Sequence, residues 1–320
     1  MGELDRRIEW IDSAKAFGML LVYIGHCFIP GVNQYIYSFH LSLFFIISGF
    51  CWRNEKYLNL SFSEFAFKKI RSYIIPYFKI CVVCFVPFCL LTGLLQYGLQ
   101  IEFWKYILRY LFGIFVYSRG TLEWLPNCSP VWFLTCLFCA ELVLFFIMKA
   151  KLPLLLIIIS GCIGYEMSLL GKIFPWNIDS AMTAIPLIYM GMLLKKYWAF
   201  VSNPMFLFAL VPLSIVLLVS GVKCVDFDGN RFDNILAMYL QSGLISLTIL
   251  VVFSLFSHGI GAKYGKETIL LLGYNYAINS VISLFPSMNH NWLMALTVVV
   301  AGALFVRIVN KYKRIKTILV

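Results

Sequence analysis

The sequence is poor in charge. Asp, Glu, Lys and Arg together make up only 13% of the 320 residues, about half the quarter that is usual in soluble domains. Hydrophobic residues account for 61%, and the mean hydropathy is +0.86. A chain with so few charges cannot cover a water-exposed surface, so the composition excludes an ordinary soluble enzyme and predicts an integral membrane protein.

Acidic residues are scarcer than basic residues, 15 against 26, which gives a net charge of +11. Such a surplus can indicate nucleic-acid binding. Here, however, the basic residues gather at the ends of apolar runs, and no basic stripe with interleaved aromatics is visible. We therefore expect membrane lipids, and no nucleic acid, around this chain.

Metal-binding patterns are also missing. The chain has four histidines and ten cysteines, and Cys81/Cys84 and Cys136/Cys139 are two CxxC pairs. Both pairs lie in apolar runs without His or acidic partners at ligand spacing. We interpret these thiols as small packing groups and expect no metal. No short charged segment, apolar core and cleavage site precede the first apolar run, so we expect that run to be retained as an anchor.

Apolar runs of bilayer length predict an all-α, polytopic membrane bundle of about ten transmembrane helices. The doubtful eleventh run, 103–117, carries Lys105 and Arg109, so we interpret it as amphipathic or half-buried. With ten crossings and both termini cytoplasmic, most basic residues fall inside. No linker or internal repeat interrupts residues 1–320, which predicts a single domain. The ten runs are 11–30, 36–52, 72–95, 130–148, 152–170, 180–194, 205–222, 234–257, 269–285 and 292–309.

Before the third run, the sequence SFSE, which begins at Ser61 and ends at Glu64, has the capping-box pattern. It predicts a short basic helix along the inner surface.

His26 lies in the first apolar run, and an ionisable residue in a span is a functional candidate because burial there is costly. Tyr23, Lys15 and Asp12 share its stripe at helical spacing, with Asp12 ~21 Å away along the helix. His40 opens the second run after the short turn 31–35, so the two imidazoles are expected at similar depth near the outside. A neutral imidazole is the usual general base for a hydroxyl; alternatively, each histidine only bonds a neighbouring helix.

Lys68, Lys69 and Arg71 lie at the inner entrance of the third run. They predict either a cradle for a phosphorylated cytoplasmic donor or the ordinary topology signal with attraction to anionic lipid.

Four further features leave alternatives open. Glu141 lies mid-run and Glu166 near the outer end of the next; such acids indicate a pathway or an interhelical pair. Trp132 is either an interfacial anchor or a substrate platform. The run CVDFDGNRFD has acids spaced like a calcium loop but lacks the downstream Glu, so we expect a solvated outer loop.

Five segments occur in an order that resembles the acyltransferase 3 family of integral membrane O-acyltransferases, and in particular its fucose 4-O-acetylase-like branch. The match covers essentially the whole chain. The segments are IDSAKAFGMLLVYIGH, FHLSLFFIISGF, KKIRSYIIPY, PVWFLTCLFCAEL and DSAMTAIPLIYMGMLLKK.

The resemblance implies transfer of an acyl group, usually acetyl, from acyl-CoA to a hydroxyl of a cell-surface sugar, in the cytoplasmic (inner) membrane of a bacterium. It implies that His26 is the catalytic base, that Asp12 is the aspartate that opens the span, and that His40 is the histidine of the second motif. It places the cluster of Lys68, Lys69 and Arg71 near the CoA phosphates.

Two positions depart from the family pattern: Ser42 replaces a common proline, and Asn275 stands near a frequent histidine. A rival hypothesis is a transporter or lipid-linked sugar flippase with Glu141, Glu166 and His26 as a proton relay, although no inverted halves are visible. A third is an inactive member that serves a partner enzyme. The sequence does not indicate an oligomeric state.

Overall fold

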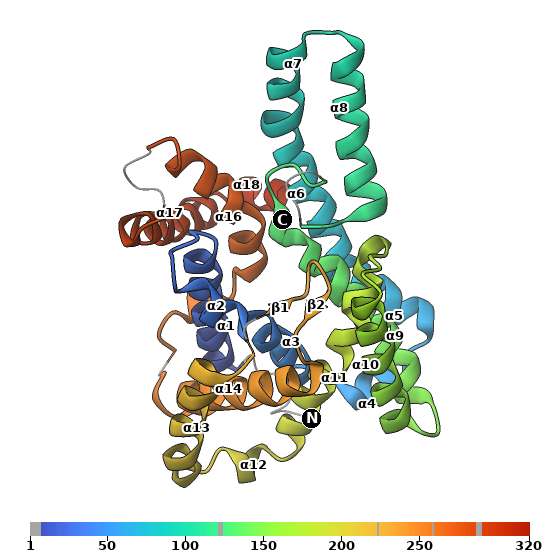
Figure 1. Cartoon of the computed structure of the whole chain (residues 1–320), viewed down its shortest axis with the longest axis vertical. Coiled ribbons are helices and arrows are strands. Elements are labelled where there is room, and N and C mark those ends of the chain that lie inside the picture. The colour runs from blue at the N-terminus through green and yellow to red at the C-terminus, as the bar shows by residue number, and fades with distance from the viewer. Residues whose placement is uncertain (1–7, 121–123, 223, 258, 286–289) are drawn as a thin grey trace. The chain divides into compact units, whose positions relative to one another are not determined.

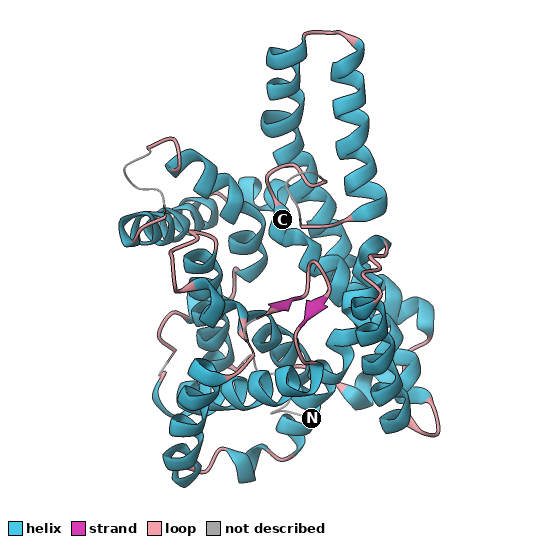
Figure 2. Ribbon diagram, viewed as in Figure 1, coloured by secondary structure: helices cyan, strands magenta, loops and turns pink. Residues whose placement is uncertain are grey.

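The computed structural model describes residues 8–120, 124–222, 224–257, 259–285 and 290–320. Within those ranges nearly all regular structure is helical, and the only strands are β1 (Val225–Asp226) and β2 (Arg231–Phe232), which pair as a small hairpin (Figure 2). The prediction of an all-α polytopic membrane bundle is confirmed.

The chain divides into two compact units; Figure 1 labels the elements of both. One contains Met1–Trp52, Leu187–Val225 and Asp233–Thr268, and the other contains Arg53–Pro186, Asp226–Phe232 and Ile269–Val320. The helix α11 (Ile178–Lys196) contributes its first part to the second unit and its last part to the first. The single domain over 1–320 stays a prediction, and the two units are described separately.

The first unit is built around α1 (Glu9–Gly25) and α3 (His40–Phe50). The predicted second run does not form one helix, because α2 (Asn33–Tyr37) ends before α3 begins. The hydroxyl of Ser38 donates to the carbonyl of Tyr35, and Phe39 leaves the helical region with φ −149°. The other helices of this unit are α12 (Trp198–Val201), α13 (Leu207–Ser220), α14 (Ile235–Phe256) and α15 (Ala262–Gly265), with a 3₁₀ turn at Pro204–Phe206.

Two glycines fix how α3 crosses α11. A Cβ on Gly49 would overlap the carbonyl of Ile188, and one on Gly191 would overlap the carbonyl of Ile46. The two helix backbones therefore touch at this crossing, which a side chain at either position would prevent.

In the second unit, one helical rod runs without interruption from Phe62 to Tyr97. The capping box is present at its start, where Ser61 Oγ accepts from the Glu64 N–H and Glu64 Oε2 accepts from the Ser61 N–H. The expectation of a separate surface helix is wrong, because nothing in the sequence between this cap and the third run breaks the helix. The rod consists of α5 (Phe62–Lys69), η1 (Ile70–Ile74), α6 (Ile75–Phe85), η2 (Val86–Leu91) and α7 (Thr92–Tyr97).

The second unit contains further elements besides this rod. They are α4 (Asn54–Leu58), α8 (Ile101–Phe112), η3 (Gly113–Tyr117), η4 (Ser129–Val131), α9 (Trp132–Lys149), α10 (Pro153–Leu169), η5 (Pro175–Asn177), α16 (Thr268–Ile282), α17 (Trp292–Lys311) and α18 (Lys313–Leu319).

Among the described residues, five helices are long and apolar enough to cross a bilayer, and three apolar helices are shorter. The protein is therefore a multi-pass membrane protein. The number of ten crossings and the cytoplasmic placement of both termini stay predictions. The five are Phe62–Tyr97, Ser129–Lys149, Pro175–Lys196, Ile235–Phe256 and Trp292–Lys311; the three are Pro153–Leu169, Pro204–Ser220 and Thr268–Ile282.

Candidate active site and a buried polar centre

His26 is the residue that ends α1. The helix closes at Gly25, and the His26 N–H still donates to the carbonyl of Val22 at 3.0 Å. Its side chain is half-buried. The other end of α1 is fixed against α15, where a Cβ on Gly265 would overlap the carbonyl of Asp12. The imidazole is thus carried by a well-anchored helix while remaining partly accessible.

The Gly25 carbonyl holds the turn between α1 and α2. It accepts a hydrogen bond from Asn33 Nδ2 at 2.7 Å and another from Tyr37 Oη at 2.9 Å. A Cβ on Gly25 would lie 2.9 Å from the Tyr37 ring, so the absence of a side chain lets the phenol approach. These contacts fix the Tyr37 ring beside the last turn of α1.

Tyr37 lies next to both predicted histidines. Its ring centroid is 6.3 Å from that of His26 and 5.1 Å from that of His40. His40 is 4% exposed, and its Nδ1 lies 2.9 Å from the carbonyl of Ile36. Since a carbonyl only accepts, Nδ1 carries the proton, and Nε2 of the neutral ring has a lone pair. The hairpin therefore collects two imidazoles and one phenol, groups suited to moving a proton.

The other members of the predicted stripe are packed. Asp12 is buried and its Oδ1 lies 3.4 Å from Lys15 Nζ, one turn along α1. Tyr23 is buried, and its carbonyl accepts from Cys27 Sγ. These contacts are of the kind that stabilise a helix in a bundle.

The predicted basic cluster is split between two environments. Lys69 is buried, and its Nζ lies 2.5 Å from Glu141 Oε2, while Tyr73 Oη donates to Glu141 Oε1 at 3.0 Å. Lys68 and Arg71 are exposed. Of the two interpretations of Glu141, the geometry shows the interhelical pair. Glu166 is exposed, so a buried relay through these two acids has no support.

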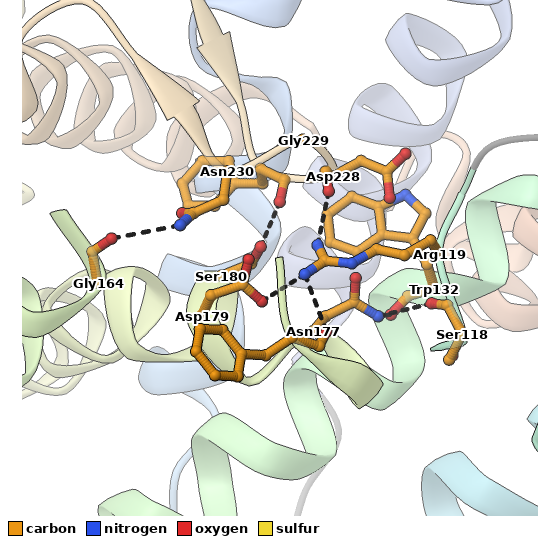
Figure 3. A network of polar contacts seen from close by, with 12 residues as sticks. Ser118, Arg119, Trp132, Gly164, Asn177, Asp179, Ser180, Asp228, Gly229 and Asn230 are labelled. Carbon is orange, nitrogen blue, oxygen red and sulfur yellow. Dashed lines mark hydrogen bonds and ion pairs between the residues drawn. The ribbon is translucent and has the colours of Figure 1, made fainter. Parts of the chain in front are cut away.

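A second set of polar groups surrounds Arg119, which is 3% exposed (Figure 3). Its Nη2 donates to Asp179 Oδ1 at 2.5 Å and to the carbonyl of Phe174 at 3.0 Å. Its Nη1 donates to the carbonyl of Asp228 at 2.6 Å. One guanidinium thus joins three segments that are far apart in the sequence.

The β1–β2 hairpin is docked onto this centre, so the expectation of a solvated outer loop is wrong. Asp228 Oδ1 accepts from the Gly120 N–H at 2.7 Å, and the Phe227 carbonyl accepts from Ser180 Oγ. Asn230 Nδ2 donates to the carbonyl of Gly164 at 3.3 Å. Phe227 is fully buried. Burial of this aromatic ring, together with the hydrogen bonds that the hairpin backbone makes, offsets the cost of removing its acids from water.

Trp132 lies at the same centre. Its carbonyl accepts from Asn177 Nδ2 at 3.4 Å and from Thr135 Oγ1 at 2.8 Å, and Asn177 also donates to the carbonyl of Ser118 at 2.7 Å. The Trp132 side chain is 6% exposed. An indole buried so fully inside the unit is not an interfacial anchor.

The pKa of Asp228 is raised from 3.8 to about 6, mainly by burial and in part by the nearby acids Asp226 and Asp179. The Gly120 N–H and the Arg119 guanidinium act in the opposite direction. Asp228 is therefore a carboxylate that gains a proton close to neutral pH, as acid–base and binding groups often do.

Sequence reasoning did not find this centre. The sequence does not single out Arg119, and it predicts that the acids of the β1–β2 segment are solvated. The available signals were Gly120 directly after Arg119 and an Asn-Ile-Asp-Ser run opening a helix. In the described part of the chain, no three His, Cys, Asp or Glu side chains are arranged to hold a metal ion.

Comparison with protein-family models gives one match, to the acyltransferase domain of the acyltransferase 3 family, over residues 8–308. Comparisons with curated proteins and with solved structures found no match. Because the matched region covers nearly all of the helices described above, this chain belongs to the acyltransferase 3 family and is a membrane acyltransferase.

Proposed function

We propose that this acyltransferase moves an acetyl group from cytoplasmic acetyl-CoA to a hydroxyl of a sugar in a cell-surface or exported polysaccharide. The observation that carries the proposal is the hairpin that collects His26, Tyr37 and His40. The fucose 4-O-acetylase-like branch and the bacterial inner membrane stay predictions that accord with this reaction.

His26 acts as the general base. It takes the proton from the acceptor hydroxyl as that oxygen attacks the thioester carbonyl. A C–O bond forms, the C–S bond breaks, and the proton passes from the imidazolium to the departing thiolate of CoA. The side chain suits this role because it is half-buried and its helix end is held by the contacts of Gly25.

His40 acts as a positioning residue. Its Nδ1–H is committed to the Ile36 carbonyl, which fixes the ring against Tyr37. Tyr37 is in turn fixed by its hydrogen bond to Gly25. These contacts hold Tyr37 and the last turn of α1 in place next to His26, and proton transfer requires such fixed positions.

The exposed cations Lys68 and Arg71 bind the phosphates of CoA. The guanidinium of Arg71 lies 4.6 Å from the Phe67 ring centroid and the residue is exposed, and a guanidinium can make bidentate contact with phosphate. Lys69 is assigned to Glu141 instead, because their ion pair is buried.

The test uses purified protein in lipid nanodiscs and measures release of CoA thiol from acetyl-CoA with and without a sugar acceptor. His26→Gln is expected to lower acceptor-dependent release by ~10²–10⁴-fold, and His40→Gln by less. His290→Gln is the matched control, since His290 is exposed and lies in a loop. Full activity of a correctly inserted H26Q protein would falsify the assignment.

A further inference from the structure

Phe28 has an unusual backbone conformation two residues after His26. Its φ is +52°, in the left-handed region in which helices commonly end, and glycine usually takes that position. A bulky side chain at positive φ is uncommon because its Cβ crowds the backbone. Three residues later, at φ +78°, the same loop does have a glycine, Gly31. Phe28 is therefore a strained residue at a position that suits glycine better.

The neighbours of Phe28 account for the turn itself. Cys27 is fully buried and its thiol donates to the Tyr23 carbonyl, while Ile29 is 5% exposed. The Phe28 N–H donates to the Gly25 carbonyl at 3.3 Å. The backbone thus turns so that both neighbours pack inside the unit. None of these contacts requires a side chain at position 28.

The Phe28 ring lies largely outside the packed core. Its exposed fraction is 49%, so burial of apolar surface does little to offset the backbone strain. The loop also borders open space, because a Cβ added to Gly31 would meet no atom of the described residues within 4 Å. Strained residues that gain little from packing are typical of functional sites. We therefore looked for a role of the ring itself.

The ring lies beside the proposed general base. The centroids of the Phe28 and His26 rings are 6.5 Å apart, and the two planes are inclined by 62°, so the rings are not stacked on each other. On the protein side, the His26 ring has Tyr37 as a neighbour at 6.3 Å. A molecule that lies on the exposed Phe28 ring is therefore within reach of the imidazole.

The chemistry of the two rings defines what can lie there. The face of a phenyl ring is electron-rich and attracts weakly positive C–H groups, whereas the imidazole needs a hydroxyl to act on. A lipid tail offers C–H groups but no hydroxyl. A pyranose offers both, because C–H groups cover its faces and hydroxyls project from its edge. It is also about as wide as a phenyl ring. Binding sites for small molecules commonly combine aromatic surface with a few polar groups in this way.

We propose that the pyranose ring of the acceptor stacks on Phe28 while one of its hydroxyls contacts His26. Phe28 is a binding residue that selects acceptors with a C–H face, and removal of the proton stays with His26. The inference rests on the proposed function, whose acceptor it assigns to a named surface. Glycine would relieve the strain at position 28, but it has no ring to offer the sugar.

Stability and activity are therefore expected to change in opposite directions at this position. Phe28→Gly relieves the strain and keeps the N–H that donates to Gly25, so its melting temperature should equal or exceed that of the wild type. The same variant lacks the stacking surface, so its KM for the acceptor should rise about tenfold. A ring that served only packing would give a lower melting temperature when it is removed.

The experiment uses the full chain in lipid nanodiscs and measures release of CoA thiol from acetyl-CoA at increasing concentrations of an acceptor. The acceptors are methyl pyranosides of the common hexoses and deoxyhexoses, and the one with the highest wild-type kcat/KM is the probe. Phe28→Tyr keeps the aromatic face and is expected to keep the wild-type KM. Phe28→Leu keeps the apolar character and the strain without the aromatic face, and is expected to raise the KM as F28G does.

The KM for acetyl-CoA is expected to stay unchanged in all three variants. Phe208→Leu is the matched control, because Phe208 is 87% exposed on α13 of the same unit; it is expected to behave as the wild type does. A wild-type acceptor KM in F28L, a rise in F28Y or F208L equal to that in F28L, or a lowered melting temperature of F28G would overturn the inference. If the wild type releases no acceptor-dependent thiol with any of the pyranosides, the proposed function fails as well.

Discussion

Lys69 and Glu141 form a buried ion pair, with 2.5 Å between Nζ and Oε2, that ties the end of α5 to the middle of α9. Tyr73 donates to the second carboxylate oxygen. The Lys69 ammonium also lies 4.7 Å from the centroid of the Tyr57 ring. A charge taken from water needs such compensation, and these contacts supply it.

Removing one partner of this pair is expected to be costly. Glu141→Gln leaves the Lys69 ammonium buried without its counter-charge, so we expect a loss of about 3–5 kcal/mol of stability. The measurement is thermal unfolding in detergent. The double variant Glu141→Gln with Lys69→Met is expected to be more stable than E141Q alone; a double variant less stable than E141Q would contradict the pairing.

The exposed cations are expected to act on the donor. Arg71→Ala and Lys68→Ala should each raise the KM for acetyl-CoA about tenfold, the size of a lost charge-assisted hydrogen bond. With a donor that lacks the 3′-phosphate, at least one of these effects should shrink. The exposed Lys151 provides the control, and Lys151→Ala is expected to leave the KM unchanged. An equal rise in K151A would indicate general surface charge instead.

The Gly25 contact is expected to control the rate of transfer. Gly25→Ala would place a Cβ 2.9 Å from the Tyr37 ring and displace it from its position between the imidazoles. We expect kcat to fall ~10²-fold, with little change in the KM for acetyl-CoA. Tyr37→Phe, which only removes the hydroxyl, should have a smaller effect. Steady-state kinetics at saturating acceptor distinguish these variants, and a larger defect in Y37F would refute the positional role.

Asp228 is expected to make stability depend on pH. Its folded-state pKa of about 6 is raised above the ordinary value of 3.8. The protonated carboxyl therefore contributes to the free energy of unfolding. This contribution is fully present below about pH 4 and is lost as the pH rises through 6. The melting temperature of the wild type should therefore fall, relative to that of Asp228→Asn, between pH 4 and pH 7.5. A difference that is constant over this range would contradict the assignment.

Local patterns in the sequence were enough to predict a helical chain and the turn that joins the helices of His26 and His40. The capping box at Ser61 could be predicted because it depends only on two residues three positions apart, and it is present in the structure. His26 and His40 come together because a short turn joins their helices. The hydrophobic pattern does not predict the break between α2 and α3, because apolar residues continue across it, whereas the Phe39 backbone leaves the helical region.

The buried polar centre could not be found in this way. Arg119, Asp179 and Asp228 come from segments separated by 49 residues or more, and nothing in their local sequence distinguishes a buried charge from a solvated one. Their roles depend on the tertiary contacts of the hairpin with η5 and α11. Similarly, Lys68 and Lys69 are adjacent in the sequence, and only the position of Glu141 in α9 makes Lys69 the one that forms a buried ion pair.

The backbone contact at Gly49 and Gly191 limits which genetic changes the protein can tolerate. Any missense change of a glycine codon adds at least one carbon atom, and here that atom has no room. Neither glycine belongs to the candidate site, yet Gly49 lies in the same helix as His40, and Gly191 lies in α11 where it meets that helix. In a saturation screen for acyl transfer, substitutions at these two glycines should therefore be tolerated as poorly as substitutions at His26. The glycine variants should also show reduced protein abundance, whereas the His26 variants should be as abundant as the wild type and lack only activity.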